Sequence, residues 1–402
     1  MMRIRLAAVV LLVVGVPAGA AAAPPSGAMV AAADREIVFP VEGTATYGTL
    51  HVPRHRVGQR LVAALLLQGG GLVDRNGDLP PERVWRTGAQ LAAALGRDGV
   101  MTLRFDKYGA GRTGAVRDVD YPALVRQAAA AYQVLRDRPE TDRARMLIAG
   151  HSEGSLTALL VATGATRPRP AGLVLFEPTS LRFLDQVRRQ SHARVAGLVS
   201  RGDLARRRQR VVVAAIDRAV ADLRAGRRPA LAGLPAGMAA MFASIRDAGA
   251  RYVVTADAVD PLTVARRVRP GTRVLLTCGT REVTVSCAQT RHLAAVLRQA
   301  RTAGPGRVVI RGTDHFLSIR RRPGVVAAPV LARLHDFVTD GRYGSSQGAA
   351  GLRNLALLVV PYVARPPWAV ERSRRCRRPA PRGTLPTRRT CRAWCATSAR
   401  TR

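Results

Sequence analysis

Short apolar runs that suit buried strands alternate with segments of helical spacing along most of this chain. The runs are Leu61–Leu67, Val100–Phe105, Arg145–Gly150, Gly172–Phe176, Arg273–Thr277 and Arg307–Ile310. The helical segments between and after them are Thr87–Gly96, Tyr121–Arg138, Glu153–Thr163, Ser286–Gln299 and Val325–Asp340. Continuous apolar runs are typical of parallel strands that are buried on both faces. The sequence therefore predicts an α/β fold with a doubly wound, mostly parallel sheet, preceded by a hairpin of Arg35–Phe39 and Thr49–Val52.

Two segments depart from this alternation. Residues 184–256 are arginine-rich and mostly helical in pattern, so we expect a helical cap inserted over the carboxyl edge of the sheet. Within it, Arg206–Arg210 is predicted to be a solvated helix face, with a phosphate-binding patch as the alternative. Residues 343–402 are rich in arginine and proline and predict a basic, disordered tail, or alternatively a polyanion-binding arm. The α/β domain is thus expected to span residues 35–342.

The first 23 residues have the pattern of a secretory signal peptide. Met1–Arg5 carries two arginines, Leu6–Val16 is apolar, and Pro17–Ala23 offers small residues for cleavage. The apolar run is short for a membrane span, although an uncleaved anchor is the alternative. We therefore expect a secreted or cell-envelope protein.

Export would permit disulfide bonds among the five cysteines. Cys278 and Cys287 are close enough in sequence to pair. Cys376, Cys391 and Cys395 in the tail have no nearby histidine, so they are a weak metal signal. The sequence shows no nucleotide-binding loop and no metal-ligand cluster, and we expect no cofactor.

The formal net charge of +37 comes almost entirely from arginine, because Lys107 is the only lysine. A general bias in composition explains this pattern better than a nucleic-acid interface, since phosphate binding does not exclude lysine. We expect no specific nucleic-acid partner. Nonspecific, salt-dependent contact with acidic envelope polymers or lipids is expected instead.

The segment Gly150-His151-Ser152-Glu153-Gly154 follows a predicted strand and opens a predicted helix. In this context the glycines permit a sharp turn that lifts a serine above the sheet edge as a nucleophile. The helix N-terminus behind Ser152 favours negative charge nearby. Ser152 is therefore the predicted nucleophile, whereas His151 and Glu153 are expected to be structural or to line a pocket.

A serine nucleophile needs a base that takes its proton. His292, His315 and His335 are the late histidines, and the first and last of these lie within predicted helices. His315 lies in a loop just after the last predicted strand. This position predicts His315 as the base.

The third member of such a site is an acid that orients the histidine. Glu282 follows the strand Arg273–Thr277 and is the preferred candidate, although a surface pair with Arg281 is an alternative role. Glu177, at the end of the preceding strand, is the rival acid. Asp260 precedes Pro261 and is predicted to cap a helix instead.

A tetrahedral intermediate requires two backbone N–H donors. The amide of Glu153, directly after the nucleophile, is one predicted donor. The other is expected from the glycine turn after Leu61–Leu67, at Gly70 or alternatively Gly71. A tight turn without such a role is the remaining interpretation.

Two further stretches carry a resemblance to a known family. Gln68-Gly69-Gly70-Gly71 with Asp74-Arg75-Asn76-Gly77-Asp78, and Arg104–Arg112, resemble the "HGSGPxDRDG" and "RYDKRGVGKS" stretches of serine-aminopeptidase-like and acyl hydrolases of bacteria. The nucleophile motif and Gly312–Phe316 match in the same order, and the resemblance covers about residues 36–338. It implies the α/β-hydrolase fold, with Asp74 and Asp106 tying loops near the site through Arg75 and Lys107. The chain departs from the family pattern at Gln68, where histidine is usual, and at Glu282, where aspartate is usual.

These residues together predict a secreted serine hydrolase that cleaves a small ester or thioester through an acyl-enzyme on Ser152. A short-peptide, aminopeptidase-like hydrolase is the nearest alternative, because the same three residues cleave both kinds of bond. A non-catalytic binder of anionic envelope polymers is the second alternative. An intact set of Ser152, His315 and Glu282 argues against it.

Overall fold

The computed structural model describes residues 27–79, 84–116, 119–247 and 249–340, which all belong to one compact unit. The predicted signal peptide (1–23), the predicted tail (343–402) and the three tail cysteines lie outside the described residues. Within the described segments, no helix is long and apolar enough to cross a membrane.

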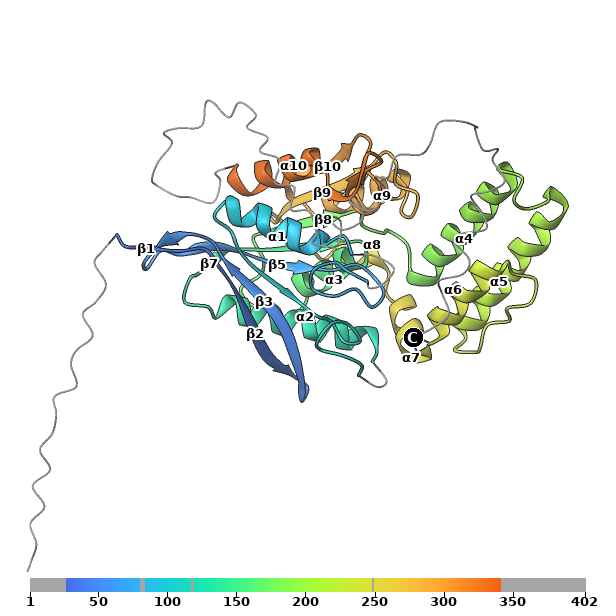
Figure 1. The fold of residues 1–402 in the computed structure, drawn as a ribbon, viewed down its shortest axis with the longest axis horizontal. Helices are drawn as coiled ribbons and strands as arrows, with labels where there is room; N and C mark the ends of the chain where they lie inside the picture. Colours follow the sequence, from blue (N-terminus) through green and yellow to red (C-terminus); the bar gives the residue numbers. More distant parts are fainter. Residues whose placement is uncertain (1–26, 80–83, 117–118, 248, 341–402) are drawn as a thin grey trace, which may run out of the picture. The chain divides into compact units, whose positions relative to one another are not determined.

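An eight-stranded sheet in the order β10-β9-β8-β7-β5-β6-β3-β2 forms the centre of the fold (Figure 1). Its strands are β2 Ala33–Val41, β3 Thr44–Val52, β5 Leu61–Leu67, β6 Met101–Phe105, β7 Thr141–His151, β8 Gly172–Phe176, β9 Arg273–Gly279 and β10 Ala303–Ile310. The strands from β5 to β10 are parallel to their neighbours, whereas the β2–β3 hairpin joins β6 in antiparallel pairing. Short strand pairs are made by β1 Met29–Val30 with β4 His55–Arg56 and by β11 Ser318–Ile319 with β12 Arg322–Val326. The predicted doubly wound, mostly parallel sheet is confirmed.

Helices cover both faces of this sheet. They are α1 Thr87–Arg97, α2 Tyr121–Arg136, α3 Glu153–Thr163, α8 Pro261–Ala265, α9 Cys287–Gln299 and α10 Ala328–Thr339. Leu65 of β5 packs into the core that contains α2, α3, α8 and α9, and its neighbour Leu66 packs into the core that contains α1 and α10. Because successive strand residues point to opposite faces, burial on both faces explains why Leu61–Leu67 is apolar throughout.

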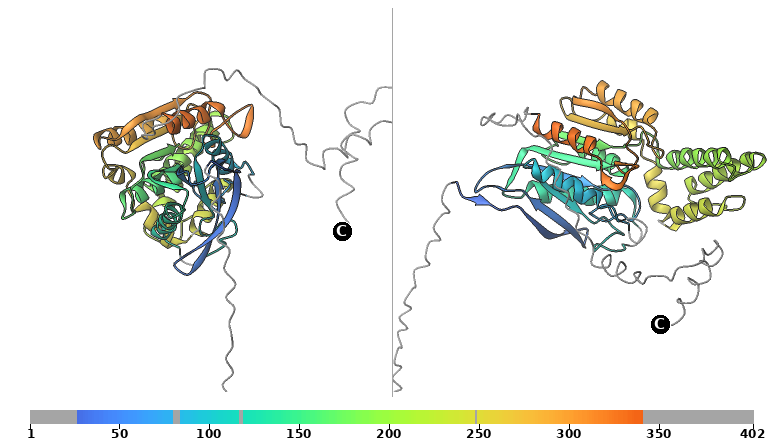
Figure 2. Two further views of the ribbon diagram at one scale, coloured as in Figure 1. Left: turned by 90° about the vertical axis from the view of Figure 1, so that its left-hand side faces the viewer. Right: turned by 45° about the horizontal axis from the view of Figure 1, so that its top comes forward.

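A helical cap is inserted between β8 and α8, as predicted. It consists of α4 Phe183–Ser200, the 3₁₀ turn Arg206–Arg208, α5 Gln209–Arg224, α6 Ala236–Asp247 and α7 Ala250–Asp257, which group together beyond one edge of the sheet (Figures 1 and 2). The cap has a core of its own that includes Leu184, Ile216 and Phe242. The arginines of Arg206–Arg208 and Arg210 are exposed.

The predicted helix Val325–Asp340 is wrong at its first turn. Val325 and Val326 belong to β12, and α10 begins only at Ala328. Pro329 in the first turn is consistent with this start, because proline lacks the N–H group that has no partner there and therefore fits the first turn of a helix. Asp260 caps α8 through a hydrogen bond from the Leu262 amide, as predicted.

Candidate active site

Ser152 lies in the sharp turn between β7 and α3. Its φ of 54° is positive, which is a strained conformation for a residue with a Cβ atom. Gly150 and Gly154 permit the turn, because an added Cβ would collide with the backbone of Gly154 at the first position and of Leu67 at the second. The Ser152 amide donates to the Phe176 carbonyl at 2.8 Å and anchors the turn to β8. The turn therefore holds Ser152 at the carboxyl edge of the sheet.

His315 lies in the loop after β10, and the structure brings it to Ser152. Its Nε2 atom is 3.1 Å from Ser152 Oγ, and its side chain is buried. The other two late histidines, His292 and His335, are exposed on α9 and α10. His335 pairs with Asp98 on the surface at 2.7 Å. Of the three candidates, only His315 is thus in a position to accept the proton of Ser152.

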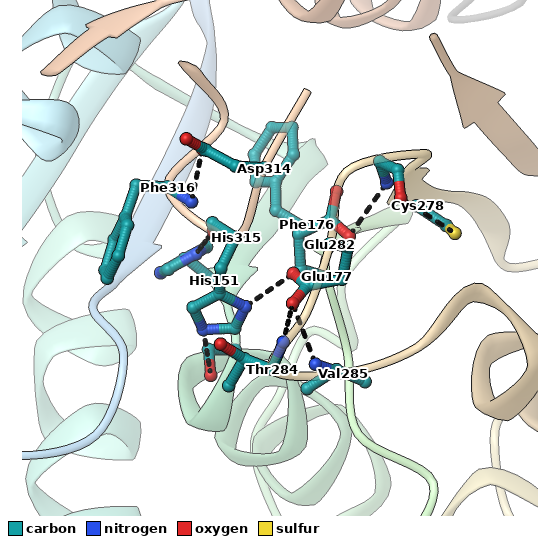
Figure 3. A network of polar contacts seen from close by, with 12 residues as sticks. His151, Phe176, Glu177, Cys278, Glu282, Thr284, Val285, Asp314, His315 and Phe316 are labelled. Carbon is teal, nitrogen blue, oxygen red and sulfur yellow. Dashed lines mark hydrogen bonds and ion pairs between the residues drawn. The ribbon is translucent and has the colours of Figure 1, made fainter. Parts of the chain in front are cut away.

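Glu282 contacts the other ring nitrogen of His315. Its Oε2 atom is 2.6 Å from His315 Nδ1 (Figure 3). Its Oε1 atom accepts hydrogen bonds from the backbone amides of Thr284 and Val285, the latter at 2.8 Å. The Glu282 side chain is fully buried, and the ion pair that the structure gives it is with His315 rather than with Arg281. The carboxylate is therefore oriented by the backbone of its own loop on one side and by the imidazole on the other.

Glu177, the rival acid, lies at the end of β8 beside Glu282 (Figure 3). It is fully buried and accepts hydrogen bonds from the Gly279 amide at 3.0 Å and from Thr277 Oγ1 at 3.4 Å. Burial, and to a smaller extent the nearby Glu282 carboxylate, raise the pKa of Glu177 from 4.5 to about 8. Glu177 is therefore largely protonated at neutral pH, and the carboxylate that contacts His315 is that of Glu282.

A disulfide bond joins Cys278 and Cys287, whose Cα atoms are 5.5 Å apart. Cys278 is in β9 and Cys287 is the first residue of α9. The bond therefore closes the base of the loop that carries Glu282. We call residues 279–286 the acid loop.

Gly70, Ser152 and Glu153 line one cavity of about 140 Å³. Gly70 lies against the Glu153 side chain, because an added Cβ would come within 2.7 Å of Glu153 Oε2. Gly71 has a φ of +80° and is not part of the lining. The two predicted N–H donors therefore belong to residues that line the same cavity as Ser152, and their role stays a prediction.

Buried polar contacts fix the loops behind this cavity. The Lys107 ammonium group donates a hydrogen bond to the Gly69 carbonyl and so holds the glycine turn. The Asp106 carboxylate accepts from the Arg75 amide at 2.8 Å, and Asp74 accepts from amides of its own turn. The contact of Asp106 with Arg75 agrees with the loop-tying role that the family resemblance implies, whereas Asp74 holds its own turn and Lys107 contacts the Gly69 carbonyl.

The residues on either side of Ser152 have different surroundings. His151 Nε2 is 2.6 Å from the backbone carbonyl oxygen of His315, so it supports the loop that carries His315. Glu153 lines the cavity, and its Oε2 atom accepts a hydrogen bond from the Tyr252 hydroxyl group of the cap at 3.0 Å. Both agree with the structural or pocket-lining roles predicted for them.

The sequence did not single out Gln186 or Tyr252, which bring the cap to the site. Gln186 Nε2 donates to the Thr284 carbonyl of the acid loop at 2.6 Å, and Gln190 donates to the same carbonyl at 3.2 Å. Gln186 and Gln190 are four residues apart in a predicted helix, which places them on one face. That spacing was the available signal, but nothing local indicated what the face would contact. Among the residues described, no cluster of three or more histidine, cysteine or acidic side chains is suited to a metal ion.

Comparisons with known proteins identify the family and the fold of this chain. The sequence model of the S33 serine aminopeptidase family matches residues 82–297, which is more than half of the chain. An esterase of Pyrococcus furiosus superposes with a TM-score of 0.51 at 13% identity, over 77% of this chain and 91% of the esterase. This likeness shows a shared α/β-hydrolase fold.

Two further solved structures are also similar to this chain. The ferulic-acid-bound Est1E of Butyrivibrio proteoclasticus has a TM-score of 0.47 at 16% identity, over 76% of this chain and 97% of Est1E. A puromycin-hydrolyzing peptidase of Mycobacterium tuberculosis has a TM-score of 0.49 at 15% identity, over 77% of this chain and 40% of the peptidase. No curated protein matches the sequence. The family match and the shared fold show that the chain belongs to the S33 serine aminopeptidase family. It is therefore an α/β-hydrolase of the esterase and peptidase kind.

Proposed function

We propose that this hydrolase cleaves a small ester or thioester through an acyl-enzyme on Ser152. The observation that carries the proposal is a series of two contacts. Ser152 Oγ lies 3.1 Å from His315 Nε2, and His315 Nδ1 lies 2.6 Å from Glu282 Oε2. A carboxylate at Nδ1 favours the imidazole form with its proton on that atom. Nε2 is then free to accept the serine proton.

In the first half of the reaction, His315 Nε2 takes the proton of Ser152 as Oγ bonds to the carbonyl carbon of the substrate. The carbonyl oxygen becomes negative and is stabilised by the amides of Gly70 and Glu153. When the tetrahedral intermediate collapses, the bond to the leaving group breaks. The His315 imidazolium returns the proton to the departing alcohol or thiol.

In the second half, water replaces the leaving group. His315 takes a proton from this water, whose oxygen bonds to the acyl carbon. Collapse then breaks the bond to Ser152 Oγ, which regains its proton from the imidazolium, and the carboxylic acid leaves. Glu282 remains ionised and stabilises the positive imidazole in both halves.

The cavity beside Ser152 supports a substrate of modest size. Its volume is about 140 Å³, and most of its lining is apolar, including Leu156, Phe183 and Val187. Residues of α4 and α7 in the cap form part of this lining, so a bulky polymer would be hindered. A short acyl chain or a small aromatic acyl group fits this chemistry.

A second candidate substrate class is favoured by Glu153. Among the described residues that line the cavity it is the only charged one, and the Tyr252 hydroxyl group binds one of its two carboxylate oxygens. A carboxylate in such a place favours substrates with an ammonium group near the scissile bond. Aminoacyl esters and short peptides with a free N-terminus are compounds of this kind.

Export of the protein remains part of the proposal. The disulfide between Cys278 and Cys287 supports it, because such bonds persist in oxidising compartments and are rare in the cytosol.

Labelling with a fluorophosphonate probe tests the proposed nucleophile and base. The full-length protein should be labelled, the Ser152→Ala variant should not, and the His315→Ala variant should react far more slowly. A folded wild-type protein that stays unlabelled at neutral pH would contradict the proposal. If labelling succeeds, hydrolysis of esters, thioesters and aminoacyl amides of matched size then ranks the candidate substrates.

A further inference from the structure

One peptide group of the acid loop connects the cap with the carboxylate at His315. It is the unit between Thr284 and Val285. Its carbonyl oxygen accepts a hydrogen bond from Gln186 Nε2 at 2.6 Å, and its N–H group donates to Glu282 Oε1 at 2.8 Å. Since the two bonds lie on opposite ends of one planar unit, rotation of that unit would break both.

Gln186 is itself held in a single orientation. Its side chain is buried, and its Oε1 atom accepts from Gln289 Nε2 at 2.8 Å and from Thr179 Oγ1 at 3.2 Å. These donors fix which end of the amide group faces the acid loop, because an oxygen turned toward the Thr284 carbonyl would be repelled. Gln186 therefore presents its N–H donor to the loop.

The loop that receives this bond is already tied at its base by the disulfide between Cys278 and Cys287. In addition, the Glu177 carboxyl group accepts from the Gly279 amide at the start of the loop. Neither tie reaches the crest at Thr284 and Val285. The crest, which orients Glu282, is held from outside the loop by residues of the cap helix α4.

Gln186, Gln190 and Val285 also line the cavity beside Ser152. A substrate in this cavity would therefore lie against the same side chains that connect the cap to the acid loop. Hydrogen bonds that run in series polarise one another, so the contacts from Gln186 through Glu282 to His315 form a connected set.

We propose that Gln186 is a positioning residue for the acid: from the docked cap it fixes the Thr284–Val285 peptide group, and this group holds Glu282 against His315. The inference rests on the proposed function, because it takes Glu282 as the acid that orients His315. It implies that the orientation of Glu282 depends on the cap, which is built from a separate part of the chain.

The test is a double-mutant cycle between Gln186 and Glu282. The rate of fluorophosphonate labelling of Ser152 is measured in the full-length protein for wild type, Gln186→Met, Glu282→Gln and the double variant. Methionine keeps the length of the side chain but removes the donor. We expect Gln186→Met to slow labelling about tenfold, which is the rate equivalent of one hydrogen bond. The double variant should react no more slowly than Glu282→Gln alone, because Gln186 acts through Glu282.

Two controls separate positioning from packing. Gln209→Met, on the cap helix α5 and outside the cavity lining, should leave the labelling rate unchanged. A readout that packing alone would not move is the proton resonance of the His315 Nδ1–H group, which a carboxylate partner shifts downfield. This resonance should move upfield in Gln186→Met and stay in place in Gln209→Met.

The outcomes are distinguishable. If Gln186→Met is labelled as fast as wild type while Ser152→Ala is not labelled, the inference is overturned and the proposed function stands. The inference is also overturned if the double variant is labelled tenfold more slowly than Glu282→Gln alone, because Gln186 would then act independently of Glu282. An unlabelled wild type would remove both proposals. Should Gln186→Met fail to fold, Gln186→Glu keeps the shape, still accepts from Gln289, and replaces the donor in the same cycle.

Discussion

The Tyr252 hydroxyl group on α7 of the cap donates a hydrogen bond to Oε2 of Glu153, the residue after Ser152, at 3.0 Å. The Tyr252 ring also packs edge-to-face against Tyr121 and Phe183, each with ring centroids 6.0 Å away. Burial raises the pKa of the Tyr252 hydroxyl well above its usual value, and the Glu153 carboxylate raises it further. The hydroxyl therefore stays a donor at any physiological pH, and the contact ties the cap to the turn that carries Ser152.

Replacing Tyr252 with phenylalanine should destabilise the protein by about 1–3 kcal/mol, because a bond to a charged acceptor is lost while the ring packing stays. Urea unfolding measures this loss. Tyr121→Phe is the matched control, since in the described part of the chain its hydroxyl group shares a hydrogen bond with the neutral hydroxyl group of Thr157, at 3.2 Å. Tyr121→Phe should lower the free energy of unfolding by less than Tyr252→Phe does. An equal loss in both variants would show that the charge of Glu153 adds nothing to the contact.

Glu282 and Glu177 should differ sharply as glutamine variants. Glu282→Gln removes the charge that stabilises the imidazolium form of His315 and the preferred tautomer, so kcat should fall about a thousandfold or more. Glu177→Gln keeps the hydrogen bond from the Gly279 amide and should change kcat less than about tenfold. Steady-state hydrolysis of a small ester compares the two variants. A larger loss in Glu177→Gln would transfer the role of the acid to Glu177.

The sequence was sufficient for those parts of the site that depend on local structure. The strand, sharp turn and helix around Ser152 are encoded by a short glycine pattern, and His315 follows from its place after the last strand of the sheet. Glu282 and Glu177 could only be ranked, because both follow neighbouring strands and therefore reach the same edge of the sheet. Which carboxyl group contacts His315 depends on how the acid loop folds back, and the amides of Thr284 and Val285 decide this.

The contacts of the cap were beyond the reach of sequence patterns for a different reason. Gln186 and Thr284 are 98 residues apart, and Tyr252 and Glu153 are 99 apart. Helical spacing predicts which residues share a face, but the partner of that face depends on how the whole cap docks. The predicted start of α10 is too early because Val325 and Val326 belong to β12, which pairs with the two-residue strand β11, and so short a strand has no pattern of its own.

Loss of the disulfide should loosen the acid loop. In the chain-entropy description, a bond across nine residues stabilises the folded state by about 2–3 kcal/mol. The double variant Cys278→Ser/Cys287→Ser should therefore unfold at a lower urea concentration than wild type. Reductant should lower the wild-type midpoint toward that of the double variant and leave the double variant unchanged. A wild type that does not respond to reductant under unfolding conditions would argue that the bond is absent in solution.

Glu177 should make the protein less stable as the pH rises. Its pKa is raised from 4.5 to about 8 on folding, so below pH 4.5 the carboxyl group is protonated in both states and imposes no penalty. Between these values only the unfolded state releases the proton, so stability falls with rising pH until about pH 8, where the loss is complete. The total loss is of the order of a few kcal/mol. Thermal unfolding of wild type and Glu177→Gln from pH 5 to pH 9 isolates this contribution, since the variant lacks the titrating group. Parallel curves for the two proteins would contradict the raised pKa.

Glu153 should set a preference for positively charged substrates if the second candidate class is correct. Glu153→Gln keeps an oxygen that can accept from Tyr252 but removes the negative charge from the cavity. For an aminoacyl ester with a free amine, kcat/KM should fall about tenfold or more, because the charged partner of the ammonium group is lost. For the N-acetylated ester, which is neutral, kcat/KM should stay the same or rise. Thermal unfolding checks that Glu153→Gln remains folded. In wild type, moderate salt should weaken the preference for the free-amine ester only slightly, because the contact with the ammonium group would be partly buried. A wild type that hydrolyses both esters equally well would exclude ammonium recognition by Glu153 and leave the neutral ester as the substrate class.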